Sequence, residues 1–186
     1  MTAAFRRRWV LVGGVALAVA LVASLLAVGL RTSDSLAEAS PLQGRSAPDF
    51  RLPALDGTAT GAVRLSDLRG QLVVVNFWAS WCTECHTEQA ALNQTWQRFR
   101  DAGVVVVGVD FEDAVGDARA FAARAGVTYP LVVDHDSSTA LAYGLRGVPE
   151  TYLVDRQGRL VDRFIGPVTA DRLGHRIAGL LGRAGS

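Results

Sequence analysis

From residue 71 onward, short apolar runs alternate with segments in which apolar positions recur at helical spacing. Residues 72–77 and 104–110 are nearly continuous runs of apolar, mostly β-branched side chains. Such runs are typical of strands that are buried on both faces of a sheet. Residues 82–100 and 113–125 carry the helical pattern, and each of them follows one of these runs. The order of the segments predicts a βαβα unit.

Beyond this unit the pattern predicts a third strand, a short helix and then a hairpin. The third strand is expected over 129–133 and the short helix over 137–143. Two apolar runs, 150–154 and 160–165, flank the turn-rich sequence Asp155-Arg156-Gln157-Gly158. Apolar runs joined by such a turn predict a β-hairpin.

One helix and one hairpin complete the predicted domain. Thr169 is expected to cap a final amphipathic helix that continues to about Gly182 and turns its apolar side chains to the sheet. Ahead of the core strands, residues 50–52 and 63–65 have the pattern of an added N-terminal hairpin. The whole pattern predicts an α/β domain.

A long uncharged apolar run, residues 9–30, precedes this domain. At about 1.5 Å per residue, a helix of that length spans roughly 33 Å, which is enough to cross a bilayer core. Three arginines before the run favour a cytoplasmic N-terminus. We therefore expect a cytoplasmic segment (1–8), a transmembrane anchor (9–30), a linker (31–43) and the α/β domain (44–186).

A cleaved signal peptide is the alternative interpretation of the same run, because Ala37-Glu38-Ala39 resembles a cleavage site. The apolar core of a signal peptide typically has about 7–15 residues. The run in this chain is longer, which favours an uncleaved anchor. No cysteine lies near it, so a lipoprotein anchor is not predicted.

Charge and cysteine content narrow the function classes. The formal net charge is +1, which offers no field for attracting nucleic acid, so no nucleic-acid partner is expected. Two cysteines in a chain of 186 residues do not make a disulfide scaffold.

Both cysteines lie in the stretch Cys82-Thr83-Glu84-Cys85, where the predicted strand changes into a helix. This spacing at such a switch is typical of a thioredoxin-type redox pair. Free N–H groups and the positive end of the helix dipole stabilise a thiolate at the first cysteine. The second cysteine lies one turn on and can form a disulfide with the first.

Three other interpretations of the pair have less support. A zinc site would need more ligands, but the chain has no second Cys-x-x-Cys and only three histidines. A static disulfide across so short a loop adds little stability. The sequence Cys82-Thr83-Glu84-Cys85-His86 also matches the haem-attachment pattern of c-type cytochromes. A further haem ligand would then have to come from His135, His175 or Met1, so we expect no metal and no cofactor.

Pro149 follows Gly147-Val148 and directly precedes a predicted strand. In a thioredoxin-like layout this loop lies across from the cysteine pair. A cis peptide there would leave the main chain of Val148 free to pair with an extended peptide. A rigid turn with no further role is the alternative.

Five stretches of the chain together carry a family likeness. They are Ala47-Pro48-Asp49-Phe50, Leu65-Ser66-Asp67-Leu68-Arg69-Gly70, Asn76-Phe77-Trp78-Ala79-Ser80-Trp81-Cys82, Gly147-Val148-Pro149-Glu150-Thr151 and Tyr152-Leu153-Val154-Asp155-Arg156-Gln157-Gly158. Over roughly residues 44–182, the chain resembles the membrane-anchored thioredoxin-like proteins of the TlpA, ResA and CcmG (DsbE) group, which serve cytochrome c maturation. The resemblance implies a thioredoxin fold, with a central mixed sheet flanked by helices and an added N-terminal β-hairpin, preceded by one transmembrane helix. It also implies a cis peptide at Pro149.

The resemblance assigns expected roles to the site residues. Cys82 would be the attacking thiolate and Cys85 the resolving thiol. Four residues are expected to contact the substrate: Trp81, Val148, Pro149 and Glu150.

Two polar positions are expected to matter for proton transfer. Asn76 stands where thioredoxins usually carry a buried Asp, so the chain lacks that proton acceptor. Glu88 stands where ResA-like proteins carry an active-site Glu, and its spacing from Cys85 puts a carboxylate beside the second thiol. There it would shuttle protons and raise the thiol pKa values by like-charge repulsion. A solvated helix residue is the alternative for Glu88, and Glu150 is expected to add negative potential on the facing loop.

Acidic groups near the cysteines favour a reductase, because a disulfide oxidant depends on a strongly stabilised thiolate. The resemblance implies a substrate, apocytochrome c or another disulfide-containing exported protein, on the outer side of the membrane. It also implies electrons from a membrane thiol carrier of the CcdA or DsbD type. A general oxidant or isomerase for secreted proteins is one alternative, and a non-catalytic tethered module that binds apocytochrome is another.

A peroxidase is not expected. Peroxiredoxins need the pattern Pro-x-x-x-Thr/Ser-x-x-Cys. Relative to Cys82, these places hold Val75 and Ala79, so the peroxide-binding proline and hydroxyl are missing.

Overall fold

The computed structural model describes residues 13–14, 16–24, 42–56 and 61–183. The chain divides into two compact units, Met1–Ala39 and Ser40–Ser186. In the first unit, residues 16–24 are helical. No helix within the described ranges is both long and apolar enough to span a bilayer. The predicted segments 1–8, 9–30 and 31–43 fall largely outside these ranges.

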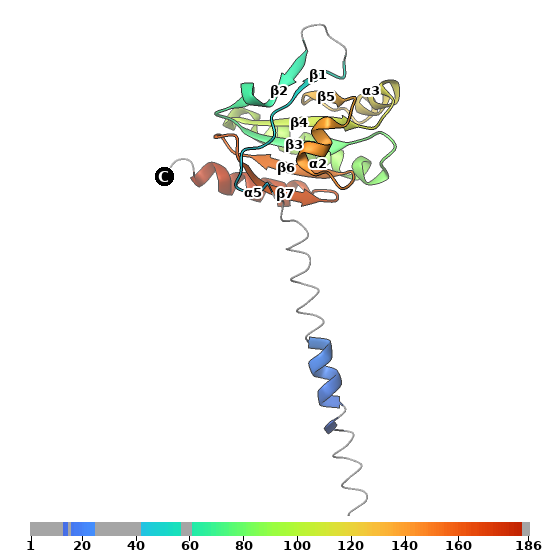
Figure 1. Cartoon of the computed structure of the whole chain (residues 1–186), viewed down its shortest axis with the longest axis vertical. Coiled ribbons are helices and arrows are strands. Elements are labelled where there is room, and N and C mark those ends of the chain that lie inside the picture. The colour runs from blue at the N-terminus through green and yellow to red at the C-terminus, as the bar shows by residue number, and fades with distance from the viewer. Residues whose placement is uncertain (1–12, 15, 25–41, 57–60, 184–186) are drawn as a thin grey trace, which may run out of the picture. The chain divides into compact units, whose positions relative to one another are not determined.

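A five-stranded mixed sheet forms the centre of the second unit (Figure 1). Its strands in spatial order are β5 (Leu131–Asp134), β4 (Val104–Phe111), β3 (Leu72–Trp78), β6 (Glu150–Val154) and β7 (Leu160–Ile165). Strand β3 pairs in parallel with β4, and β4 with β5. Strands β6 and β7 run antiparallel, which makes the sheet mixed, as predicted.

Four helices accompany this sheet in the described part of the second unit. They are α2 (Thr83–Phe99), α3 (Val115–Arg124), α4 (Ser138–Tyr143) and α5 (Ala170–Arg183). The hydroxyl of Thr169 accepts a hydrogen bond from the N–H of Arg172 at 3.3 Å, so the predicted cap of the last helix is confirmed.

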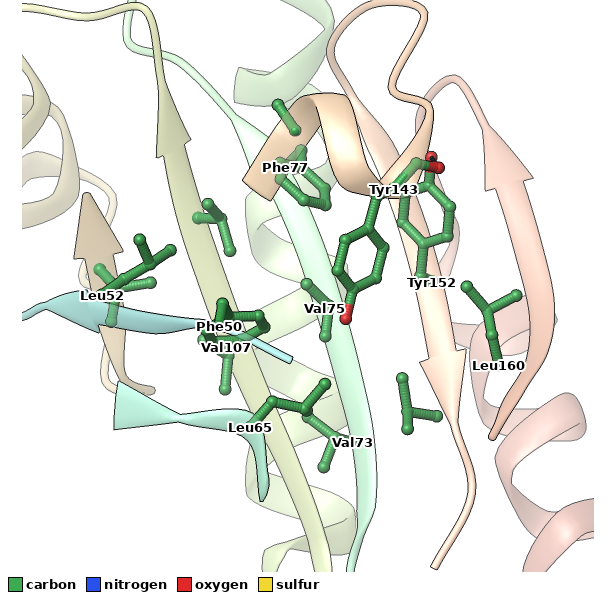
Figure 2. Close-up of a cluster of buried hydrophobic side chains, with 14 residues drawn as sticks. Phe50, Leu52, Leu65, Val73, Val75, Phe77, Val107, Tyr143, Tyr152 and Leu160 are labelled. Carbon is green, nitrogen blue, oxygen red and sulfur yellow. Dashed lines mark hydrogen bonds between the residues drawn. The ribbon is translucent and has the colours of Figure 1, made fainter. Parts of the chain in front are cut away.

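All seven residues of β3 are buried, and their side chains alternate between the two faces of the sheet. The odd-numbered side chains join a cluster with residues of β1 and α4 (Figure 2). Leu72 and Val74 join a second cluster with α2 and α5 on the opposite face. Burial of one such side chain stabilises the fold by about 1.5–3 kcal/mol. The apolar run of this strand is therefore continuous because its alternating side chains are buried in two separate cores.

The N-terminal hairpin predicted from residues 50–52 and 63–65 is present. Strand β1 (Arg51–Pro53) pairs antiparallel with β2 (Ala62–Arg64). A bridge between Ala54 and Val132 joins the hairpin to β5. The short 3-10 helix η1 (Leu65–Leu68) then leads towards β3, and a second one, η2 (Arg100–Ala102), follows α2.

The predicted element boundaries differ from the observed ones by at most two residues. The start of β5 differs for a clear reason. Its pairing begins at Leu131 because Pro130 has no N–H to donate, although its carbonyl accepts the N–H of Gly108 at 2.9 Å. The preceding Tyr129 turns its ring into the core and donates its hydroxyl proton to Gln89 at 2.8 Å.

Gly108 is a point of close approach between β3, β4 and β5, and Gly108→Ala tests it. A Cβ at this position would lie 2.5 Å from Cδ2 of Leu131 and 3.0 Å from Nε1 of Trp78. We expect the substitution to lower the free energy of unfolding by about 1–3 kcal/mol, because neighbouring side chains must leave their preferred rotamers. Urea denaturation followed by tryptophan fluorescence measures the change.

The matched control is Gly179→Ala in α5, where a Cβ meets nothing within 4 Å. This change should stabilise the helix by up to about 1 kcal/mol. A Gly108→Ala protein that is as stable as the control would contradict the tight packing around Gly108.

Candidate active site

The cysteine pair lies where β3 ends and α2 begins. Cys82 and Cys85 form a disulfide. Cys82 is the N-cap of α2, and its sulfur accepts the N–H of Cys85 at 3.1 Å. Cys82 retains 6% of its surface exposed, whereas Cys85 is completely buried. An incoming sulfur can therefore reach Cys82 only, and the helix N-terminus is placed to stabilise a thiolate on that residue.

The loop before Cys82 is held by the segment that follows β4. Asp113 accepts the N–H of Ser80 at 2.5 Å and its hydroxyl proton at 2.9 Å. The indole N–H of Trp81 donates to the carbonyl of Glu112 at 3.0 Å. The indole nevertheless remains 59% exposed beside Cys82. Sequence reasoning missed Asp113, although its place just after a strand parallel to β3 would have pointed to this edge of the sheet.

His86 braces the same loop from α2. One of its ring nitrogens lies 2.9 Å from the carbonyl oxygen of Ser80. Its ring also lies against that of Phe121, with centroids 4.5 Å apart. His86 is exposed, but the two contacts tie α2 to both the loop and α3.

Asp110, at the end of β4, is a buried acid that sequence reasoning also missed. It is 1% exposed, and neither carboxyl oxygen accepts a hydrogen bond from any described residue. Burial, and after it the charge of Asp113, raises the pKa of Asp110 to about 7. A neutral Asp110 can share its proton with Asp113, which itself holds the cysteine loop.

Glu88 is buried, so the alternative of a solvated helix residue is wrong. It is 1% exposed. Its carboxylate accepts the amide N–H of Asn76 at 2.8 Å and the main-chain N–H of Val168 at 3.0 Å. Burial raises the pKa of Glu88 to about 7, although the hydrogen bonds from Val168 and Asn76 act in the opposite direction. Glu88 of α2 is thus hydrogen-bonded to Asn76 of β3, the residue at the position where thioredoxins usually carry an Asp.

The amide of Asn76 can serve both protonation states of Glu88. Its Nδ2 donates to Glu88 and, at 3.0 Å, to the hydroxyl of Thr151. Its Oδ1 is buried and has no partner within the described ranges. If the amide turned over, this oxygen would accept hydrogen bonds from the carboxyl O–H of neutral Glu88 and from the Thr151 hydroxyl.

The loop before β6 faces the cysteine pair. The Val148–Pro149 peptide is cis, as the resemblance implies. The side chain of Val148 packs against the buried cluster that contains Cys82 and Cys85. Pro149 is buried, and its carbonyl accepts the N–H of Gly166 at 3.0 Å. By contrast, the main-chain N–H and C=O of Val148 form no hydrogen bond with the part of the chain that the structure describes.

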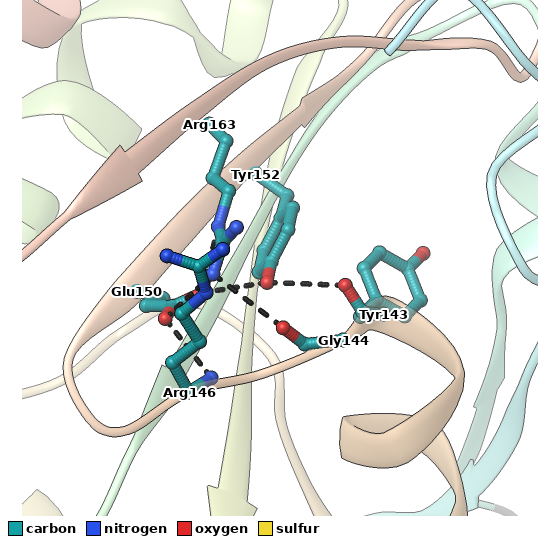
Figure 3. A network of polar contacts seen from close by, with 6 residues as sticks. All are labelled: Tyr143, Gly144, Arg146, Glu150, Tyr152 and Arg163. Atoms are coloured by element: carbon teal, nitrogen blue, oxygen red, sulfur yellow. Dashed lines mark hydrogen bonds and ion pairs between the residues drawn. The ribbon is translucent and has the colours of Figure 1, made fainter. Parts of the chain in front are cut away.

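Glu150 does not provide the negative potential expected of it. Its side chain is 1% exposed and forms an ion pair with the equally buried Arg163 at 2.7 Å. The hydroxyl of Tyr152 donates to it at 2.6 Å and the main-chain N–H of Arg146 at 3.1 Å (Figure 3). The guanidinium offsets the charge of the carboxylate.

The family model described as AhpC/TSA matches residues 43–163, more than half of the chain. The chain belongs to the AhpC/TSA family. The family's peroxidase pattern is absent here, since Val75 and Ala79 are buried apolar residues at the positions of the required proline and hydroxyl.

Relatives within the family are thiol-disulfide oxidoreductases. The chain is 34% identical over 128 residues to the thiol-disulfide oxidoreductase ResA of Geobacillus thermodenitrificans, covering 69% of this chain and 72% of that protein. It is 34% identical over 163 residues to the thiol:disulfide interchange protein DsbE of Pseudomonas fluorescens, covering 87% of each. It is therefore a thiol-disulfide oxidoreductase of the ResA and DsbE group.

Solved structures agree with this assignment. A structure described as a DsbE-type thiol:disulfide interchange protein from Chlorobium tepidum has a TM-score of 0.69 and 35% identity, covering 75% of this chain and 97% of that one. A Bacteroides thetaiotaomicron structure described as a protein disulfide isomerase has a TM-score of 0.67 and 30% identity, covering 78% of this chain and 94% of that one. The thioredoxin-like fold implied by the sequence is confirmed.

Glu88→Gln should flatten the dependence of stability on pH. The pKa of Glu88 is raised from 4.5 to about 7, so its neutral form is favoured in the folded state. Its contribution to stability is full below pH 4.5 and is lost as the pH rises through 7. The loss amounts to at most about 3 kcal/mol. Urea denaturation at pH 4.5 and pH 8 should show a smaller difference for the variant than for the wild type.

Glu84→Gln is the matched control, because Glu84 is exposed on the first turn of the same helix. It should keep the pH dependence of the wild type. If Glu88→Gln and Glu84→Gln behave alike, Glu88 is not the buried titrating group.

Asp110→Asn should raise the melting temperature at pH 8 more than at pH 5. The pKa of Asp110 is raised from 3.8 to about 7, so the stability that it contributes at low pH is also lost as the pH rises through 7. The amide is neutral at both pH values and can donate to Asp113, as a neutral carboxyl group would. The exposed neighbour Glu112 supplies the control Glu112→Gln, which should not change the difference between the two pH values.

Proposed function

We propose that this oxidoreductase works outside the cytoplasm as a reductase, which opens the disulfide of apocytochrome c before haem attachment. The Glu88 carboxyl group is the observation that carries the direction of the reaction. It is buried one helical turn after Cys85 on α2, and it accepts hydrogen bonds from two neutral donors, Asn76 and Val168. An ionised Glu88 disfavours a thiolate nearby by charge repulsion. A dithiol whose thiolate is not strongly stabilised has a low reduction potential and donates electrons readily.

The reaction begins with attack by the Cys82 thiolate on one sulfur of the substrate disulfide. That bond breaks as a mixed disulfide with Cys82 forms, and the other substrate sulfur leaves and takes up a proton. Cys85 then loses its proton and attacks Cys82. The second substrate sulfur leaves and is released as a thiol. The substrate has then gained two electrons, and the protein has lost two electrons in forming the Cys82–Cys85 disulfide. Glu88 and Asp110, whose pKa values are raised to about 7, would take up and return protons near neutral pH.

Two residues would receive the polypeptide substrate. Trp81 presents an exposed indole next to Cys82. Val148 has an unpaired main-chain N–H and C=O within the described chain, which suits pairing with an extended segment. Pro149 and Glu150, which were also expected to contact the substrate, are buried and hold this loop where β6 begins.

Returning the disulfide to the dithiol requires an electron supply. Export compartments oxidise thiols, so a reductase there depends on electrons that cross the membrane. We infer that a membrane thiol carrier of the CcdA or DsbD type reduces Cys82–Cys85. The uncharged run 9–30, with arginines before it, supports an anchor with the redox domain on the outer side.

A general disulfide oxidant or isomerase for exported proteins is the second candidate. The 30% identity to a structure described as a protein disulfide isomerase favours it. So does the hydrogen bond from the Cys85 N–H to the Cys82 sulfur, which stabilises a thiolate.

The reduction potential of the full-length protein separates the two candidates. We expect a midpoint near or below about −250 mV, in the range of thioredoxin, when the protein is equilibrated in thiol redox buffers. Fluorescence of Trp81 beside Cys82 reports the state of the disulfide. The Cys82→Ser, Cys85→Ser double variant should show no transition and serves as the control.

A midpoint near about −120 mV would identify an oxidant and favour the second candidate. The apocytochrome assignment has its own test in a strain that carries the double variant. A normal amount of holo-cytochrome c in that strain under oxidising growth would contradict the assignment.

A further inference from the structure

The ion pair between Glu150 and Arg163 lies next to the substrate loop. Arg163 of β7 donates from Nε and Nη2 to the carboxylate of Glu150 at 2.7–2.9 Å. The guanidinium also lies 5.5 Å from the ring centroid of Tyr152. The hydroxyl of Tyr152 lies 3.3 Å from the carbonyl of Tyr143 and 2.6 Å from Glu150, so its one proton goes to the nearer acceptor.

The remaining bonds of the pair hold the main chain at the start of the loop. Glu150 accepts the N–H of Arg146 at 3.1 Å, and Arg163 donates to the carbonyl of Gly144 at 3.4 Å (Figure 3). Gly144 is the C-cap of α4. At the other end of the loop, Glu150 is itself the first residue of β6. One buried side-chain pair therefore joins both ends of the segment 144–150 to β7.

Charge burial alone does not explain such an arrangement. A buried ion pair contributes little net stability compared with apolar side chains of similar volume. A bidentate pair does, however, fix the relative orientation of its two side chains, because a guanidinium and a carboxylate meet in one plane. Here that plane sets the position of the main chain that leads to Val148, which packs against the cluster of Cys82 and Cys85.

We propose that Arg163 is a positioning residue for disulfide exchange with polypeptides, which acts through Glu150 to hold the Val148 main chain ready for a substrate strand. The inference rests on the substrate-binding role proposed above for Val148. A preset loop lowers the ordering cost of binding, so its loss raises KM. Small disulfides that do not pair with a main chain gain nothing from the loop. Arg163 therefore affects one class of substrate and not the other.

The decisive variant is Arg163→Lys in the full-length protein, since lysine keeps the positive charge and loses the planar fork. The reduced protein is mixed with an oxidised peptide that contains one Cys-x-x-Cys-His disulfide, and separately with 2-hydroxyethyl disulfide. We expect kcat/KM for the peptide to fall about tenfold, mostly through KM, which corresponds to about one lost hydrogen bond. The rate with the small disulfide and the midpoint potential should not change.

Arg176→Lys is the matched control. Arg176 pairs with Asp162 of β7, but its partners do not include the loop, and the pair is partly exposed. It should leave both rates unchanged. If Arg163→Lys folds poorly, the charge-free double variant Glu150→Gln, Arg163→Met replaces it, with the same expected rise in KM.

Each result bears on one of the two proposals. Equal peptide KM values for the Arg163→Lys and Arg176→Lys proteins would overturn the positioning role, while saturable peptide reduction by the wild type would leave the proposed function intact. A parallel fall with the small disulfide would also overturn it, because the pair would then act on the cysteines. If the wild type itself does not saturate with the peptide, the substrate role of the loop fails first, and the positioning role falls with it.

Discussion

The burial of β3 on both faces is the constraint on which the rest of the domain depends. Its alternating side chains require one apolar layer from α2 and α5 and another from β1 and α4. Because both layers cover the strand, β3 continues until the chain reaches the edge of the core. It ends at Trp78, and the turn that follows makes Cys82 the cap of α2. The same burial encloses Cys85, so the pair can react from one side only.

Three of the four buried acids in the described part of the chain are accommodated in three different ways. Glu88 receives hydrogen bonds from two neutral donors, Asp110 is subject to the charge of Asp113, and Glu150 forms an ion pair with Arg163. A buried carboxylate without a cation is costly, so the first two take up protons near neutral pH. Of the acids that can exchange protons, Glu88 follows Cys85 by one turn of α2, and Asp110 interacts with Asp113, which holds the cysteine loop. The charge-paired acid, Glu150, lies beside the substrate loop. This separation suits a reaction that moves protons at one place and binds a chain at another.

The sequence-based predictions are accurate where the interacting residues are close together in the chain, and less accurate where they are far apart. The hairpin β6–β7 was predicted to the residue, since its turn and its apolar runs are contiguous in the chain. Strand β5 was placed two residues too early because apolar pattern does not show where Pro130 interrupts the ladder. Spacing singled out Glu88 but left burial and solvation open, because the Val168 N–H that it meets lies 80 residues away. Glu150 was assigned an electrostatic effect that Arg163 cancels.

By itself, the sequence determined the order of the elements, the redox pair and its place between a strand and a helix. These depend on hydrophobic periodicity, turn residues and the spacing of two cysteines, all of which are local. Only the tertiary structure decided which polar groups meet around the pair: Asp113 at Ser80, Asn76 at Glu88 and Arg163 at Glu150. The physical reason is that apolar burial follows a repeating pattern along the chain. A buried polar group depends instead on a hydrogen bond or ion pair with a particular partner. The number of residues between the two partners follows no pattern in the sequence.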